Sequence, residues 1–330
     1  MRLPSTSGGP MSSGQIIEGR AARPLSILGP TASGKSSLAL GVVELLAAQG
    51  QPAELVSIDS MQVYAGMNVG TAKPTLAEQA AVPHHLINLV DPSEVFTVAA
   101  FQRSARKVIT DICARGAVPI LVGGTGLYLR SVIDDLDIPP QFPDTRSVLD
   151  AELAAGTSIE TMYEQLSELD PTAAERMEPN NERRILRALE VVLGSGRLFS
   201  SFGPGLETYP ATPFVQVAIR WPRNELDERI ERRYADQMAA GFLDEVRWLR
   251  KTGPSHTAAQ ALGYRELLAH LDGETTLDDA LELAITRTRQ FARRQERWFR
   301  RDPRIVWLDA PVDPADAMVV WDQALAGSVP

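Results

Sequence analysis

The segment from Gly29 to Ser36, GPTASGKS, has the residue types and spacing of a phosphate-binding loop, G-x-x-x-x-G-K-[ST]. In such a loop, glycines let backbone N–H groups turn toward phosphate oxygens, the lysine contacts the phosphate and the hydroxyl contacts Mg²⁺. This pattern assigns Lys35 to phosphate and Ser36 to Mg²⁺. Ser33 and Gly34 would supply amides at the start of a helix, whose dipole favours anions. The motif predicts phosphate chemistry without specifying the reaction.

A second polar segment, SIDSMQVYAGMNVGTAKP, follows from Ser57 to Pro74. Taken alone, Asp59 is compatible with a metal ligand or a helix N-cap. Ser60, Gln62 and Tyr64 follow it, and this polar cluster suits a planar ring with hydrogen-bonding edges better than a metal alone. No N-K-x-D tetrad for reading guanine occurs in the chain, which disfavours a GTPase.

Alternating strands and helices must position these two segments. We expect strands at Pro24–Leu28, Ala53–Asp59, His85–Val90, within Ala117–Gly126, and at Phe214–Trp221 and Arg304–Asp309. We expect helices from Lys35 onward and at about 97–115, 224–251, 258–271 and 276–300. This order predicts an α/β fold with a parallel sheet flanked by helices, of the type of P-loop NTPases. Ligands of such sheets collect at the carboxyl ends of the strands, where Asp59 and Gly123–Gly126 fall.

The composition divides the chain into three parts. Residues 1–22 are rich in Gly, Ser and Pro and are predicted to be a disordered tail. Residues 23–139 and 204–330 are predicted to form the α/β core. Residues 140–203 are predicted to be a helical insertion, with helices near 146–155, 158–169 and 181–193 and a Gly- and Ser-rich hinge at 194–205.

Overall composition excludes several classes of protein. The chain has 330 residues, 44% of them hydrophobic, and a single cysteine, Cys113, which excludes a disulfide framework and a cysteine-based zinc finger. The net charge of -9 excludes a uniformly basic nucleic-acid binder, although arginines cluster in three helical segments that are either local binding patches or solvated faces. No apolar run approaches the roughly 20 residues of a membrane span. We expect a cytoplasmic monomer that does not contact a membrane.

Six segments of the chain resemble those of the bacterial tRNA dimethylallyltransferases, also called tRNA isopentenyltransferases, of the IPP transferase family. In order they are GPTASGKS, SIDSMQVYAGMNVGTAKP, HHLINLVDPSEVFTVAAFQ, PILVGGTGLYLRS, RRILRALEV and ALGYRE. The resemblance extends from about Pro24 to Leu308. It implies transfer of a dimethylallyl group from dimethylallyl diphosphate to N6 of adenosine 37 in tRNA, with Mg²⁺ as cofactor.

The resemblance also implies roles for individual residues. The phosphate-binding residues Gly29, Pro30, Thr31, Ala32, Ser33, Gly34, Lys35 and Ser36 would hold the diphosphate leaving group. Asp59 would be the general base that accepts the proton of N6. Arg233 would contact the diphosphate, although adjacent Arg232 leaves the register open by one residue and a surface salt bridge is the alternative. Thr125 would lie near the target nucleotide, although its glycine neighbours are also compatible with a simple tight turn.

Contacts to tRNA are implied for three segments and for Thr125. The residues concerned are Asp59, Ser60, Met61, Gln62, Thr125, Arg183, Arg184, Arg187, Gln260, Gly263, Tyr264 and Arg265. The target base must leave its stack to reach a strand end, which costs least in an unpaired loop. Eukaryotic relatives carry a C-terminal zinc finger that the lone Cys113 excludes here, so tRNA would be held by the core and the insertion alone.

Two other functions are compatible with the phosphate-binding loop. A small-molecule kinase with a helical lid would bind ATP and transfer its γ-phosphate, but it would leave the Ser57–Pro74 segment unexplained. A non-catalytic, nucleotide-dependent RNA-binding switch would account for the arginines, but it would leave Asp59 without a role and lacks a base-reading tetrad.

Overall fold

The computed structural model describes residues 23–203 and 205–327, so the predicted tail at 1–22 lies outside the described residues. The chain divides into two compact units. One contains the described residues up to Asp135 and those from Ala211 onward, and the other is Leu136–Pro210. The second unit begins four residues before and ends seven residues after the predicted insertion at 140–203.

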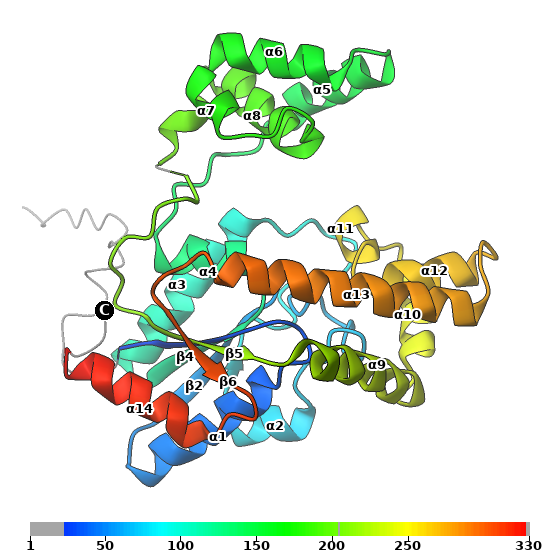
Figure 1. The fold of residues 1–330 in the computed structure, drawn as a ribbon. Helices are drawn as coiled ribbons and strands as arrows, with labels where there is room; N and C mark the ends of the chain where they lie inside the picture. The colour runs from blue at the N-terminus through cyan, green and yellow to red at the C-terminus, as the bar shows by residue number, and fades with distance from the viewer. Residues whose placement is uncertain (1–22, 204, 328–330) are drawn as a thin grey trace, which may run out of the picture. The chain divides into compact units, whose positions relative to one another are not determined.

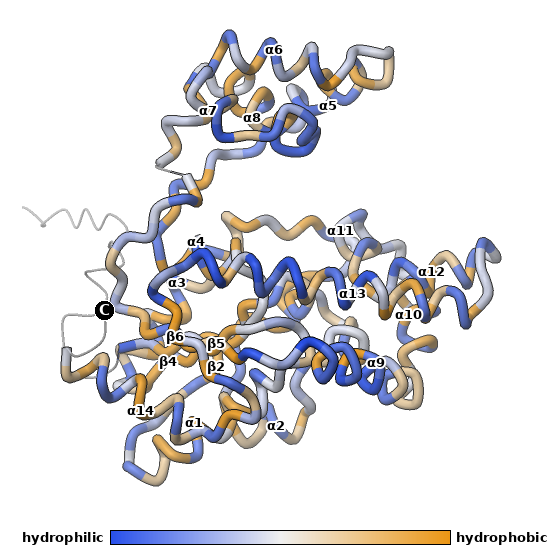
Figure 2. Tube along the Cα trace, viewed as in Figure 1, coloured by the Kyte–Doolittle hydropathy of each residue, from blue (hydrophilic) through white to orange (hydrophobic). Residues whose placement is uncertain are grey.

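A six-stranded parallel sheet forms the centre of the first unit, in the order β3-β2-β4-β1-β5-β6. The strands are β1 Leu25–Leu28, β2 Ala53–Ile58, β3 His84–His85, β4 Val118–Gly123, β5 Val215–Arg220 and β6 Ile305–Asp309. Several strands are almost continuously hydrophobic (Figure 2) because helices cover both faces of a parallel sheet. The predicted α/β fold, a parallel sheet flanked by helices, is confirmed.

Helices cover the sheet on both faces (Figure 1). α1 (Lys35–Ala48) and α14 (Pro314–Leu325) share one hydrophobic cluster with β1, β4 and β5. The hydrophobic cluster on the other face contains residues of α3 (Val98–Ala114), α4 (Gly126–Ile133), α9 (Arg223–Ala239), α10 (Phe242–Thr252), α11 (His256–Ala259), α12 (Tyr264–Leu271) and α13 (Leu277–Phe299). The short α2 (Leu76–Ala81) precedes β3. Within residues 23–203 and 205–327, none of the helices has the length and apolar character needed to cross a bilayer.

The predicted strand at His85–Val90 is wrong beyond its first residue. β3 ends at His85 because Leu86 and Asn88 have positive φ values of 63° and 54°, which no extended strand allows. The chain then runs beside the segment that follows Asp59, where Asn88 N donates to Gln62 O at 3.0 Å and Leu89 N donates to Val63 O at 2.7 Å. The apolar residues therefore support a loop near the site instead of extending the sheet.

Glycines divide two of the predicted helices. The helix expected at 224–251 is split into α9 and α10 by Gly241, whose φ is +93°, and the helix expected at 258–271 is split into α11 and α12 by Gly263, whose φ is +83°. α14 was not predicted, although Asp313 at its N-cap and Pro314 at its first position are typical start signals.

The second unit is a small helical bundle with its own core. It contains α5 (Pro143–Ala154), α6 (Ile159–Leu169), α7 (Pro171–Glu175) and α8 (Glu182–Ser195), of which α7 was not predicted. Leu149, Leu166 and Leu189 are among the buried residues of its core. Arg187 ties the start of this unit to α8, because it donates to Glu190 Oε1 at 2.5 Å and to the Pro139 carbonyl at 2.7 Å.

Glu245 on α10 holds the segment that follows Asp59. Its carboxylate accepts hydrogen bonds from the backbone N–H groups of three consecutive residues, Asn68, Val69 and Gly70, at 2.7, 2.8 and 3.0 Å, and from the Tyr264 hydroxyl at 2.5 Å. Phe242 and Tyr264 pack so closely here that a Cβ on Gly70 would lie 2.2 Å from Phe242 Cε2. The position of this part of the loop therefore depends on the Glu245 carboxylate and on the absence of a side chain at Gly70.

We predict that Glu245→Ala lowers the free energy of unfolding by about 2–4 kcal/mol, because it leaves three N–H groups and a hydroxyl without their charged acceptor. Asp244→Ala is the matched control: Asp244 is exposed and forms a surface ion pair with Arg247, so its loss should cost less than about 1 kcal/mol. Urea unfolding of both variants measures the difference. Equal stabilities would show that Glu245 is not what holds the loop.

Candidate functional site

Three loops start at the same level of the sheet, because the strands that precede them are adjacent and in register. Gly123 at the end of β4 is paired with Leu28 of β1 on one side and with Ile58 of β2 on the other. The phosphate-binding loop follows Leu28, the Asp59 segment follows Ile58 and the Thr125 turn follows Gly123. The two predicted motifs thus meet at the carboxyl edge of the sheet.

The phosphate-binding loop is held in place by a residue that directly follows β5 and by one from α9. Gly34 has φ +91° and Ala32 has φ +63°, the left-handed conformations needed to turn backbone N–H groups inward. The Trp221 indole donates to Ser33 O at 2.9 Å, and Arg229 Nε donates to Ala32 O at 2.8 Å. Neither Trp221 nor Arg229 was predicted, since both lie about two hundred residues from the loop.

Two cations lie at this loop. Lys35 Nζ donates to Pro30 O at 2.6 Å, and Arg233 Nη1 donates to Thr31 Oγ1 at 3.0 Å. Burial, followed by the repulsion of Arg233, lowers the pKa of Lys35 to about 7, while the charge of Asp59 opposes this shift. Burial also lowers the pKa of Arg233. Two partly buried cations at one loop repel each other, so the binding of an anion beside them is electrostatically favourable.

The structure also distinguishes Arg233 from its neighbour. Arg233 is half-buried and turned toward the phosphate-binding loop, whereas Arg232 is exposed. Of the two registers left open by the sequence, the geometry favours Arg233 as the contact to an anion in the loop.

Asp59 stands directly after β2 and is half-buried. Its Oδ1 accepts from Met61 N at 2.8 Å and from Gln62 N at 3.3 Å, so one oxygen caps the following turn. The Oδ2 atom accepts no hydrogen bond from any residue that the structure describes. Asp59 also interacts electrostatically with Lys35 and Arg233. One carboxylate oxygen is thus fixed, and the other remains available beside the cationic loop.

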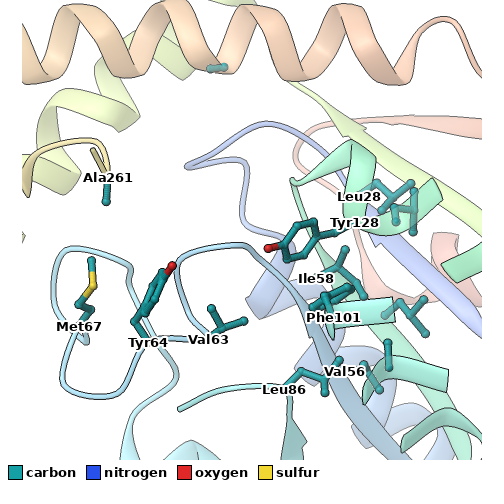
Figure 3. Close-up of a cluster of buried hydrophobic side chains, with 14 of the residues drawn as sticks. Leu28, Val56, Ile58, Val63, Tyr64, Met67, Leu86, Phe101, Tyr128 and Ala261 are labelled. Atoms are coloured by element: carbon teal, nitrogen blue, oxygen red, sulfur yellow. The ribbon is translucent and has the colours of Figure 1, made fainter. Parts of the chain in front are cut away.

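The segment after Asp59 is anchored by apolar side chains and by amides. Its hydrophobic residues enter one cluster with β2 and α4 (Figure 3): Val63, Tyr64 and Met67 from the loop, Val56 and Ile58 from β2, and Tyr128 from α4. Gln62 accepts from the Ser57 hydroxyl at 2.8 Å and donates to Thr71 O at 3.2 Å, so its side-chain amide has internal partners. The Met61 side chain packs against this core.

Thr125 joins the third loop to the second. Its hydroxyl oxygen accepts from Ser60 N at 3.2 Å, and its own N–H donates to Ile58 O at 3.4 Å. A Cβ on Gly123 would lie 2.1 Å from Ile58 O, so the close approach of the two loops requires glycine there. The sequence left two interpretations open for Thr125: a residue near the target nucleotide, or part of a simple tight turn. The structure is compatible with both, because Thr125 is the N-cap of α4 and also a neighbour of Ser60.

Gln295 on α13 was missed by the sequence analysis. It is buried, and its side-chain amide contacts both the phosphate-binding loop and the Thr125 turn. Its position on the buried face of α13, in step with Ala292 and Phe299, was the available signal: a polar residue on an apolar face requires polar partners.

Two of the predicted tRNA contacts near α12 require correction. Gln260 and Arg265 are exposed, but Tyr264 is 1% exposed and Gly263 is buried. The side chain of Tyr264 holds Glu245 and packs edge-on against Phe242, so it offers no surface to a partner. It has a structural role in supporting the Asp59 segment.

The arginines of the second unit also separate into two kinds. Arg183 and Arg184 are exposed on α8. Arg187 donates internally to Glu190 and to the carbonyls of Pro139 and Pro140, and its side chain is 27% exposed. Its predicted contact to tRNA stays a prediction.

The residues around the loop fit a Mg²⁺ ion of the kind that depends on a substrate for most of its ligands. Ser36 is exposed in the first turn of α1, and no hydrogen bond to its hydroxyl is found within the described part of the chain. Residues 23–203 and 205–327 contain no group of three acidic, His or Cys side chains that would bind a metal alone. Mg²⁺ accepts such sites, since it commonly binds one or two protein oxygens together with phosphates and waters.

The lowered pKa of Lys35 predicts a pH dependence of anion binding. Above pH 7 the free protein increasingly carries a neutral Lys35, so binding of an anion that needs the ammonium must take up a proton. Between pH 7 and 9, the affinity for inorganic pyrophosphate should therefore fall more steeply with pH in the wild type than in Lys35→Met. The difference between the two slopes should be up to about tenfold per pH unit. Calorimetric titrations across this range provide the measurement, and parallel slopes for the two proteins would contradict the assignment.

Comparison with protein families and curated proteins supports a single family. The model of the family described as IPP transferase matches residues 62–302. A tRNA dimethylallyltransferase of Kineococcus radiotolerans is 48% identical over 297 residues, covering 88% of this chain and 93% of the relative. A tRNA dimethylallyltransferase of Thermobifida fusca is 47% identical over 302 residues, covering 89% of this chain and 93% of the relative.

Solved structures agree with this comparison. The tRNA isopentenylpyrophosphate transferase of Bacillus halodurans is 37% identical, with a TM-score of 0.65, and the match covers 92% of this chain and 95% of that one. A eukaryotic dimethylallyltransferase acting on tRNA is 26% identical, with a TM-score of 0.75, and the match covers 92% and 79%. With these matches over most of its length, and with the phosphate-binding loop, Asp59 and Thr125 meeting at one edge of its sheet, the chain belongs to the IPP transferase family.

Proposed function

We propose that this protein transfers the dimethylallyl group of dimethylallyl diphosphate to N6 of adenosine 37 in tRNA, giving N6-isopentenyladenosine and diphosphate. The observation that carries the proposal is the placement of an available Asp59 carboxylate oxygen beside a loop with two partly buried cations, Lys35 and Arg233. The family comparison supports the same reaction.

The cationic loop suits the leaving group. When the C1–O bond of dimethylallyl diphosphate breaks, its electron pair goes to the diphosphate, which gains negative charge. Lys35, Arg233 and the Gly34 amide interact more strongly with this developing charge than with the substrate, and so lower the barrier, whereas the Ser33 amide, also predicted for this role, donates to Pro30 O at 3.3 Å. Bound at Ser36 and the diphosphate oxygens, Mg²⁺ would supply further positive charge to the leaving group. No phosphoryl group is transferred.

Asp59 suits the nucleophile. The lone pair of N6 is delocalised into the adenine ring, and the amine must lose a proton as the new C–N bond forms. The Oδ2 atom of Asp59 can accept that proton while Oδ1 stays fixed by Met61 N. A positioned base of this kind contributes about 10²- to 10⁴-fold to a rate.

Polar residues at the strand ends and on the surface are candidates for contacts to the tRNA. Ser60 and Thr125 lie at the strand ends where the flipped base would enter. Arg183 and Arg184 on the second unit, and Gln260 and Arg265 near α12, remain as candidate contacts. Binding through arginine to phosphate should weaken as salt rises. We propose that the protein acts as a cytoplasmic monomer.

The test is mass spectrometry of nucleosides from an unmodified anticodon stem-loop that carries adenosine at position 37. It is incubated with Mg²⁺, dimethylallyl diphosphate and either the wild type, Asp59→Asn or Asp322→Asn. Asparagine keeps an acceptor for Met61 N but cannot take the proton, so we expect kcat to fall by about 10²- to 10⁴-fold. Asp322 is exposed on α14 and is the matched control, for which wild-type activity is expected.

Absence of the dimethylallyl mass from all products would contradict the proposed function. Wild-type turnover by Asp59→Asn would leave the reaction in place but remove Asp59 as the base. Consumption of ATP on a small acceptor would instead favour the kinase alternative.

A further inference from the structure

Gln295 is the single side chain that connects the phosphate-binding loop to the Thr125 turn among the hydrogen bonds of the described residues. Its Oε1 accepts from Thr31 N at 2.8 Å, and its Nε2 donates to Gly124 O at 2.9 Å. A side-chain amide fits this position because it presents one acceptor and one donor in a fixed plane. The residue is 7% exposed, so both bonds lie in a largely water-free environment.

The contacts around Gln295 extend to both halves of the proposed site. On one side, Thr31 accepts a hydrogen bond from Arg233, which lies at the diphosphate loop. On the other side, Gly124 precedes Thr125, whose hydroxyl accepts from Ser60 N next to Asp59. Gln295 therefore stands between the elements for the leaving group and those for the acceptor base.

The surroundings show that the position is closely fitted. A Cβ on Gly124 would lie 2.2 Å from Gln295 Nε2, so the turn needs glycine to bring its carbonyl within reach. α13, which carries Gln295, is anchored by two further contacts: the Tyr234 hydroxyl and Thr288 hydroxyl lie 2.8 Å apart, and Arg287 binds buried Glu266 at 2.5 Å. The amide is thus held on a rigid element.

From this geometry we propose that Gln295 is a positioning residue, which sets the distance between the diphosphate bound at the phosphate-binding loop and the adenosine bound beside Asp59. This inference rests on the proposed function. Gln295 is not assigned as a ligand of the diphosphate, because its Oε1 accepts from Thr31 N and its Nε2 donates to Gly124 O. Reactions between two bound groups depend steeply on such a distance, and an error of about 1 Å can cost about 100-fold.

The test compares Gln295→Met, which is close in size but lacks both hydrogen-bonding groups, with Gln290→Met, the same change at an exposed position of α13. We expect kcat of Gln295→Met to fall about 10- to 100-fold. The KM for each substrate, and the Kd for inorganic pyrophosphate, should stay within about threefold. Gln290→Met should match the wild type.

A second variant disrupts the same contact from the side of Gly124, whose carbonyl accepts from Gln295 Nε2. Gly124→Ala places a methyl group against Gln295 Nε2 and should reproduce the fall in kcat. Because both substitutions disrupt the contact between Gln295 and Gly124, kcat of the double variant should be little lower than that of either single variant. If Gln295→Met does not fold, Gly124→Ala carries the same comparison.

The outcomes separate the positioning role of Gln295 from the proposed function. An inactive wild type would overturn the proposed function itself. An active wild type together with unchanged kcat in folded Gln295 variants would overturn the positioning role. Pyrophosphate affinity that falls as much as kcat would also overturn it, because Gln295 would then serve only the shape of the phosphate-binding loop.

Discussion

The close pairing of three adjacent parallel strands at Gly123 is the constraint on which the site depends. A side chain at this position would run into the carbonyl of Ile58, so β2 and β4 end against each other, and β1 ends at the same level on the other side. Three loops with different chemistry must therefore leave the sheet within a short distance of one another. The hydrogen bonds between them follow, because buried backbone groups that lose their strand partners need others.

The charges at this edge indicate a site that is arranged for a ligand and not for stability. Lys35 and Arg233 donate to a carbonyl and a hydroxyl, and neither forms an ion pair with a carboxylate in the described residues. Partly desolvated cations without an anionic partner are unfavourable in the free protein. A diphosphate would relieve this cost, which links binding directly to charge stabilisation during bond breaking. By contrast, the largely buried Arg304 has carboxylate partners in Asp134 and Asp302.

Sequence reasoning succeeded where the chemistry is local. Fewer than ten consecutive residues are enough to predict each of three features: the phosphate-binding loop, the strand that ends before Asp59 and the turn at Thr125. It failed where partners come from far away in the chain: Gln295 lies 264 residues from Thr31, and no spacing rule connects them. Tyr264 and Arg187 have polar side chains typical of a binding surface, but each is held by an internal carboxylate, which only the folded chain reveals. The strand predicted after His85 failed for a different reason: Leu86 has a left-handed conformation although leucine carries no signal for a turn, and Asn88, a residue type that tolerates this conformation, stands within an otherwise apolar run.

In the proposed reaction the phosphate-binding loop holds a leaving group, so that the bond from carbon to oxygen breaks. Dimethylallyl diphosphate labelled with ¹⁸O at the oxygen that joins C1 to phosphorus tests this directly, with the label followed by mass spectrometry during a single turnover on the stem-loop. If the loop holds a leaving group, the label appears in diphosphate in a one-to-one ratio with the modified adenosine. Label retained with the five-carbon group would mean that phosphorus was attacked instead, and it would rule out this role of the loop.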